Sequence, residues 1–161
     1  MPELVNGLPL HPLLVHFVVV LMPLAVLGAV VIAVWPAGRQ RYGWLVVAVA
    51  AVATVLVPLA TSSGGKLKAR IAGPNNQLVN RHEELGNLML WFAIPLLVFV
   101  AALMVVHTMS QRQEIRWAKL AIVVIAVLTV GSAVAAGIHV YRVGEAGSRA
   151  VYGDVQNLPV R

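Results

Sequence analysis

Four of the five histidines in this chain lie beside long apolar runs and could act together. His11 and His16 stand at the start of the first run, His82 precedes the third run, and His139 ends the fourth. If the runs cross a bilayer as antiparallel helices, all four imidazoles reach the same membrane face. Histidines near lipid are uncommon, and those that occur usually face a ligand, an ion or a proton path. These four residues are therefore the first candidates for chemistry.

Three kinds of chemistry use histidines in such an arrangement. Two imidazoles on facing helices can ligate haem iron, several can hold a divalent metal, and one can relay protons with a nearby carboxylate. We expect His11, His16, His82 and His139 to bind a cofactor, haem b or a divalent metal. The metal ligands would be His16, His82 and His139, with His16 and either of the other two as the leading pair. The alternative is that each histidine only forms hydrogen bonds at a helix end.

A second polar group follows the fourth apolar run. The segment from Arg142 to Tyr152 combines glycines, which permit a turn, with Arg142, Arg149 and the carboxylate of Glu145. The arginines could pair with Glu145 or bind an anionic group such as a haem propionate or a lipid phosphate. We therefore add Arg142 and Glu145 to the expected cofactor-binding residues. The competing interpretation is a solvated ion pair in the tail.

Composition identifies the class of protein. Of 161 residues, 60% are hydrophobic and 11% are charged, and the mean hydropathy is +0.85. Continuous apolar runs of about 20 residues suit membrane spans, and in lipid each span must satisfy its own backbone groups, which favours helices. The sequence predicts an all-α, integral membrane, antiparallel four-helix bundle forming one domain over residues 1–161. The expected helices cover about 13–35, 44–61, 84–107 and 117–139, with a polar connection at 62–83 and a tail at 140–161.

Two details of these elements are also expected. Ser63-Gly64-Gly65 is a stop signal for the second helix, although the connection after it has apolar positions typical of a partly helical segment. Small residues at 131–137 would let the fourth helix pack closely at the centre of the bundle or against a flat ligand. His107 lies alone near the opposite ends of the runs, where we expect an interfacial residue.

Charge and residue usage exclude several classes. The net charge is +6, but the basic residues flank apolar runs, where lipid headgroups and insertion orientation explain them, so nucleic-acid binding is not expected. The chain has no cysteine, which excludes disulfides and thiolate metal sites. It has no nucleophile elbow, Walker loop, dinucleotide fingerprint or His-Glu-x-x-His pattern. We therefore expect no catalytic residues and a chain that is not an enzyme on its own.

Orientation follows from the first helix. The residue before it that carries a charge is Glu3, whereas Arg39 and Arg41 follow it. The Lys and Arg residues divide five to seven between the two sides, with the larger number on the side of the termini, so the total favours one orientation and local density the other. Because the first helix usually dominates the positive-inside rule, we expect both termini outside the membrane.

Three motifs, taken in order, resemble a known family. Residues 7–17 (GLPLHPLLVHF), 81–86 (RHEELG) and the glycine-containing segment 142–152 are similar to the motifs of DUF2231, a family of small prokaryotic membrane proteins. The resemblance covers essentially the whole chain, and it implies four membrane helices and a bacterial plasma-membrane location, without an established activity. His11, His16 and His82 match the pattern. Family members often have histidine where this chain has Glu145, so the resemblance does not support a ligand there.

Three functions are then open. The leading hypothesis is a haem- or metal-binding membrane protein of the electron-transfer type. The second is a non-catalytic accessory or scaffold subunit that forms a homo-oligomer or joins a larger membrane complex. The third, a small-molecule or proton transporter, has weaker support because the apolar runs carry no charged residue at mid-membrane.

Overall fold

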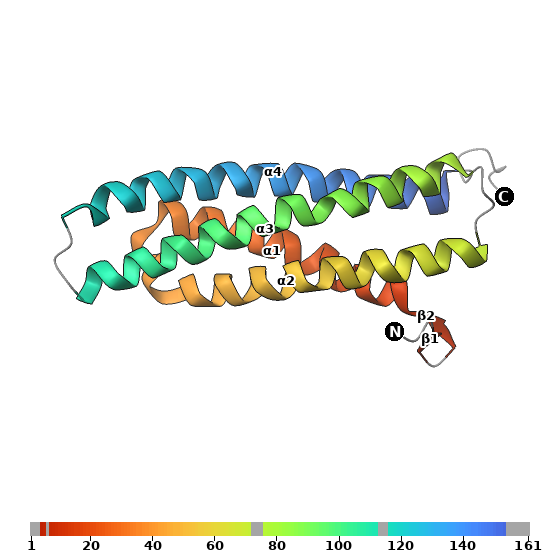
Figure 1. Cartoon of the computed structure of the whole chain (residues 1–161), viewed down its shortest axis with the longest axis horizontal. Helices are drawn as coiled ribbons and strands as arrows, with labels where there is room; N and C mark the ends of the chain where they lie inside the picture. Colours follow the sequence, from red (N-terminus) through yellow and green to blue (C-terminus); the bar gives the residue numbers. More distant parts are fainter. Residues whose placement is uncertain (1–3, 6, 72–75, 113–115, 154–161) are drawn as a thin grey trace, which may run out of the picture.

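The structure is a computed structural model that describes residues 4–5, 7–71, 76–112 and 116–153. Within these ranges four long helices run antiparallel to one another (Figure 1). All four are long and apolar enough to span a membrane. The predicted all-α membrane bundle is therefore confirmed. The helices are α1 (Leu10–Val34), α2 (Pro36–Ile71), α3 (Gln77–Arg112) and α4 (Ala118–Tyr152).

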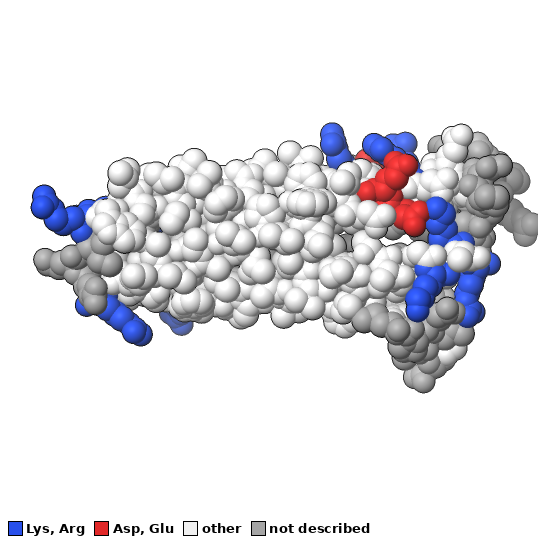
Figure 2. All heavy atoms as spheres, in the orientation of Figure 1, with Lys and Arg blue, Asp and Glu red and all other residues white. Residues whose placement is uncertain are grey.

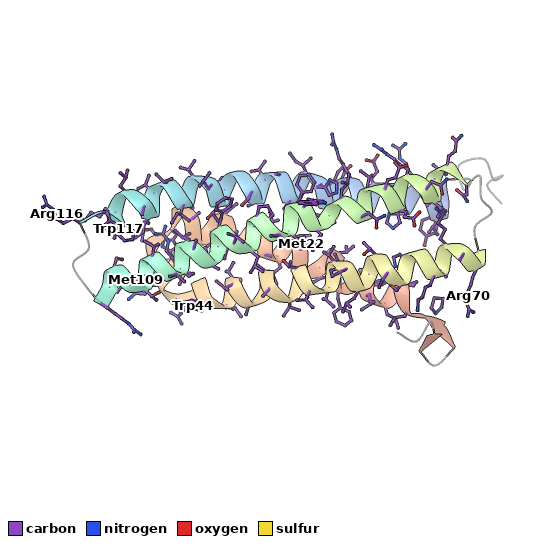
Figure 3. The ribbon with its side chains drawn as sticks, in the orientation of Figure 1. Met22, Trp44, Arg70, Met109, Arg116 and Trp117 are labelled. Atoms are coloured by element: carbon purple, nitrogen blue, oxygen red, sulfur yellow. The ribbon has the colours of Figure 1, made fainter. Side chains whose placement is uncertain are left out.

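The helices form a closed ring in chain order. Each packs against the next, α4 packs back on α1, and α1 and α3 lie diagonally opposite with little contact. One end of the bundle holds the starts of α1 and α3 and the ends of α2 and α4, and we call it the histidine end. The other end holds Trp44 and Trp117 (Figure 3), and we call it the tryptophan end. A short antiparallel pairing of β1 (Leu4–Val5) with β2 (Leu8–Pro9) precedes α1.

Small residues fill the centre of the bundle. Five alanines are completely buried, and a few larger side chains such as Met22 and Leu103 fill the remaining space. The outer surface between the two ends is almost entirely uncharged (Figure 2), and large apolar side chains such as Trp91 lie exposed on it. Because lipid is as apolar as these side chains, close backbone approach and polar links must hold the helices together. The five alanines are Ala25, Ala29, Ala53, Ala133 and Ala136.

The helices extend beyond the predicted spans at the histidine end. α2 continues through Gly64 and Gly65 to Ile71, and α4 continues to Tyr152, so much of the expected connection and tail is helical. The prediction that α2 stops at Ser63-Gly64-Gly65 is wrong. Contacts with α1 and α3, described below, outweigh the low helix propensity of glycine. The 11 residues after Ala60 lengthen α2 by about 16 Å.

Arg39 ties α1 to α2 at the tryptophan end. α2 begins with Pro36 immediately after Trp35, so Arg39 lies in its first turn. Its Nε donates to the carbonyl of Ile32 at 2.7 Å, and its Nη2 donates to that of Ala33 at 2.6 Å. The last carbonyls of a helix have no partner within it, and the guanidinium supplies one. Arg39 is consequently only 5% exposed, although the sequence suggested a flanking surface charge.

Gly28 provides a test of close packing between α1 and α2. A Cβ atom at Gly28 would lie 2.9 Å from Cγ2 of Val46, whereas one at Gly131 would meet nothing within 4 Å. We expect Gly28→Leu to lower the free energy of unfolding in detergent by about 1–3 kcal/mol, because the packed interface must shift. Gly131→Leu, on the lipid-facing side of α4, should not lower it. Equal thermal stability of the two variants would contradict this packing.

Candidate functional site

His11 links α1 to α2 at the histidine end. Its Nδ1 lies 2.9 Å from the carbonyl oxygen of Ala60, and because a carbonyl only accepts, Nδ1 carries the proton. Ser63 Oγ donates to the same oxygen at 2.8 Å. The imidazole lies against Gly64, where an added Cβ would be 2.9 Å from Cε1 of His11. Gly64 follows Ala60 by four residues, so it holds the position that normally bonds that carbonyl in an α-helix.

His82 links α3 to α4 in the same way. Its Nδ1 lies 3.0 Å from the carbonyl oxygen of Val143, so this nitrogen also donates. The ring lies against Gly147, where an added Cβ would be 3.0 Å from Cε1 and 3.1 Å from Nδ1. Gly147 again follows the accepting residue by four positions. The two imidazoles therefore use the same atom, the same kind of acceptor and the same glycine position.

The two rings meet inside the bundle. Their centroids are 6.2 Å apart and their planes form an angle of 70°. They come from α1 and α3, the helices that face each other diagonally, and both are partly buried. An imidazole that donates through Nδ1 to a carbonyl keeps Nε2 as its potential metal-ligating nitrogen. The structure thus brings together two imidazole rings, each fixed by a main-chain carbonyl and each with such a nitrogen.

His139 forms a second hydrogen bond between α3 and α4, at a different level of the bundle. Its Nε2 lies 2.9 Å from the carbonyl oxygen of Leu85, and its ring stacks on Phe92 with centroids 4.2 Å apart. It is 5% exposed. His139 of α4 bonds to a carbonyl of α3, whereas His82 of α3 bonds to a carbonyl of α4. These two reciprocal hydrogen bonds join α3 to α4 at levels about one helical turn apart.

His16 does not join this group. Its side chain is exposed, and its Nδ1 lies 2.5 Å from the carbonyl oxygen of Pro12 in its own helix. His11 and His16 are five residues apart, about 500° on a helix, and they lie on different faces as that spacing requires. The structure therefore gives the partner of His82 as His11, rather than His16.

The polar residues of α4 are mostly on the surface. Arg149 pairs with Glu145 at 2.7 Å, and both Arg142 and Glu145 are exposed. This is the local ion pair that was weighed against an anion site. A second ion pair joins Lys68 of α2 to Glu83 of α3 at 2.5 Å, beside His82.

Within the described ranges, no three side chains of His, Asp or Glu gather closely enough to hold a metal ion. His16, His82 and His139 accordingly do not form a common ligand set in this structure. The pair that does converge, His11 and His82, offers two nitrogens.

Comparison with known proteins agrees with the architecture. A family model described as a predicted membrane protein, DUF2231, matches residues 7–157, nearly the whole chain. The chain belongs to the DUF2231 family. No curated protein and no solved structure matches it.

Three features of this DUF2231 protein were not found from its sequence. Gly64 and Gly147 leave the space that the imidazoles of His11 and His82 occupy, and Lys68 forms an ion pair between α2 and α3. The glycines lie in Gly- and Ser-containing stretches that usually indicate turns, so no local signal distinguishes them. Only the pairing of the helices shows which glycine meets which histidine.

His139 and His16 form a matched pair for measuring these links in the DUF2231 protein. His139→Ala removes a buried hydrogen bond and an aromatic stack, and we expect a loss of about 2 kcal/mol in unfolding free energy. His16→Ala removes only a bond within its own helix, and a change below about 0.5 kcal/mol is expected. Unfolding of purified protein in mixed micelles measures both. Similar losses would show that His139 does not clamp α3 to α4.

Proposed function

We propose that this membrane protein binds haem b between His11 and His82 and transfers electrons. The observation that carries the proposal is the pair of imidazoles with protonated Nδ1 atoms donating to Ala60 and Val143. Histidines that ligate metals almost always donate their other ring nitrogen to a carbonyl or carboxylate, which fixes the tautomer and the ring orientation. Both rings meet this requirement in the structure.

The separation of the rings supports the same proposal. A metal–imidazole bond is about 2.0–2.1 Å, so two imidazoles that would hold one metal must have ring centroids within about 6 Å of each other. The observed separation is 6.2 Å. A porphyrin supplies four further nitrogens, so haem iron needs only two protein ligands. Two imidazoles with no third protein donor among the described residues therefore suit haem better than a bare divalent metal, which is the alternative cofactor.

Other residues at the histidine end would leave space for a haem and supply positive charges for its propionates. Gly64, Gly86 and Gly147 lack side chains on three of the helices around the pair. Lys68 lies one turn beyond Gly64, and Arg142 precedes the residue that accepts from His82. These cations would bind haem propionates, as was proposed for Arg142 from the sequence. His139 and His16 would not be ligands, and Glu145 would act through its ion pair with Arg149.

Absorption spectra of the purified protein test this assignment. We expect a Soret band from about one haem per chain when the protein is produced with sufficient haem. His11→Ala and His82→Ala should each remove the six-coordinate spectrum, while His16→Ala should keep it. Elemental analysis of the same samples detects a bare metal. A wild-type protein that binds neither haem nor metal, or a His11→Ala variant with an unchanged spectrum, would overturn the proposal.

An accessory or scaffold subunit is the second candidate. It is favoured by the hydrogen bonds themselves, since His11, His82 and His139 each link two helices. In that case the imidazoles only stabilise the bundle, and the exposed apolar helix faces pack on a second copy or on a larger complex. The His11→Ala and His82→Ala variants would then lose stability, and the wild-type spectrum would show no cofactor.

We place the protein in a bacterial plasma membrane with both termini outside. The first described basic residues after the first span are Arg39 and Arg41, at the tryptophan end, and a positive flank of the first helix favours the cytoplasmic side. Every described acidic residue lies at the histidine end (Figure 2). The haem site would then lie near the outer face of the plasma membrane.

The lack of cysteine makes this orientation easy to measure. Ser148 is exposed at the histidine end and Gln111 is exposed at the tryptophan end. In intact spheroplasts, Ser148→Cys should react with a membrane-impermeant maleimide, and Gln111→Cys should react only after the membrane is permeabilised. The opposite labelling pattern would reverse the topology.

A further inference from the structure

An apolar groove of about 400 Å³ opens between α1 and α4 at the tryptophan end. One side is formed by the last turn of α1 and the other by a stretch of α4, and all of the lining side chains except one are apolar. The exception is Arg39. The lining residues are Ala33, Val34, Arg39, Ile122, Val123, Ala126, Val127 and Val130.

Arg39 brings a positive charge to this groove, and no carboxylate is among the described residues that line it. Its bonds to Ile32 and Ala33 use two of the five N–H groups of the guanidinium. Another basic side chain, His107, lies close enough to Arg39 to interact with it electrostatically. His107 is buried, and its Nε2 has no hydrogen-bond partner within the described structure. A buried charge is costly unless an opposite charge compensates it. This end of the bundle therefore favours an anion.

The described charges of the whole end agree with this conclusion. Arg39, Arg41, Arg112, Arg116 and Lys119 lie there, and the described acidic residues all lie at the other end. On the face that Figure 2 shows, the red atoms of the described acidic residues lie near the histidine end.

The groove also has the layout of a lipid site. Lys119 precedes Ile122 by three residues and Val123 by four, so it lies one turn closer to the bundle end on the same face of α4. Trp35 and Trp117 are exposed at this level, where aromatic rings favour the headgroup region. The cationic side chains therefore lie at headgroup depth, and the apolar lining continues toward the middle of the bilayer.

We infer that this groove binds one anionic phospholipid. Its phosphate contacts Arg39 and Lys119, and one acyl chain lies along α4 from Ile122 to Val130. Pockets between membrane helices that carry basic residues recognise anionic headgroups in this way. A zwitterionic lipid is a poorer ligand because its own ammonium group opposes the basic residues. This site is at the opposite end from His11 and His82 and does not depend on haem binding.

Native mass spectrometry of the full chain tests the charge requirement. The detergent-purified protein is mixed with equal amounts of phosphatidylglycerol and phosphatidylcholine that carry the same acyl chains. We expect one phosphatidylglycerol to be retained with a preference of about five-fold. Arg39→Gln should remove the preference and Arg39→Lys should keep it. Arg41→Gln, which changes an exposed arginine outside the groove, is the control and should also keep it.

A second pair of variants tests the groove itself and leaves the hydrogen bonds from Arg39 to the end of α1 in place. Ala126→Phe fills the groove, and Val124→Phe adds the same side chain to an exposed position two residues away, outside the lining. Ala126→Phe should lose the retained lipid and Val124→Phe should not. If Arg39→Gln fails to fold by circular dichroism and gel filtration, this pair decides the result. Equal retention of both lipids by the wild type, or equal retention by the two Phe variants, would overturn the inference.

Discussion

Hydrogen bonds from side chains to main-chain carbonyls of a neighbouring helix hold this bundle in register. At one end His11, His82 and His139 donate to carbonyls of α2, α4 and α3, and at the other end Arg39 donates to the last carbonyls of α1. In a bilayer, apolar contacts between helices gain little over contacts with lipid, so they do not specify one arrangement. Directional bonds at both ends do.

These bonds require helices that approach closely. Small, completely buried side chains such as those of Ala29 and Ala53 let the helix backbones approach each other closely, and Gly28 lets α1 pack directly against Val46 of α2. At the histidine end Gly64 and Gly147 leave room for whole imidazole rings. The hydrogen bonds and contacts of the imidazoles that fit against these glycines outweigh the low helix propensity of glycine there. Packing and polar links therefore depend on each other.

The sequence predicts the number of helices, their direction and the gathering of histidines at one end. It does not predict which histidines meet. A helix that is apolar on all sides carries no sequence signal for its inner face, because lipid and bundle interior have the same preference for apolar residues. From the sequence we therefore put His16 ahead of His11, whereas the rotation of α1 brings the ring of His11 close to that of His82. The buried cap formed by Arg39 and the helical extension past Gly64 likewise depend on contacts between helices.

His11 and His82 have matched surroundings. Each imidazole donates through Nδ1 to a carbonyl of the next helix in the chain and lies against the glycine four residues after that carbonyl, so exchanging α1 with α3 and α2 with α4 exchanges the two sets of contacts. A ligand held between the two rings would meet similar groups on both sides. Any difference between the sides must come from residues that break this match, such as Ser63 beside His11 and Glu83 next to His82.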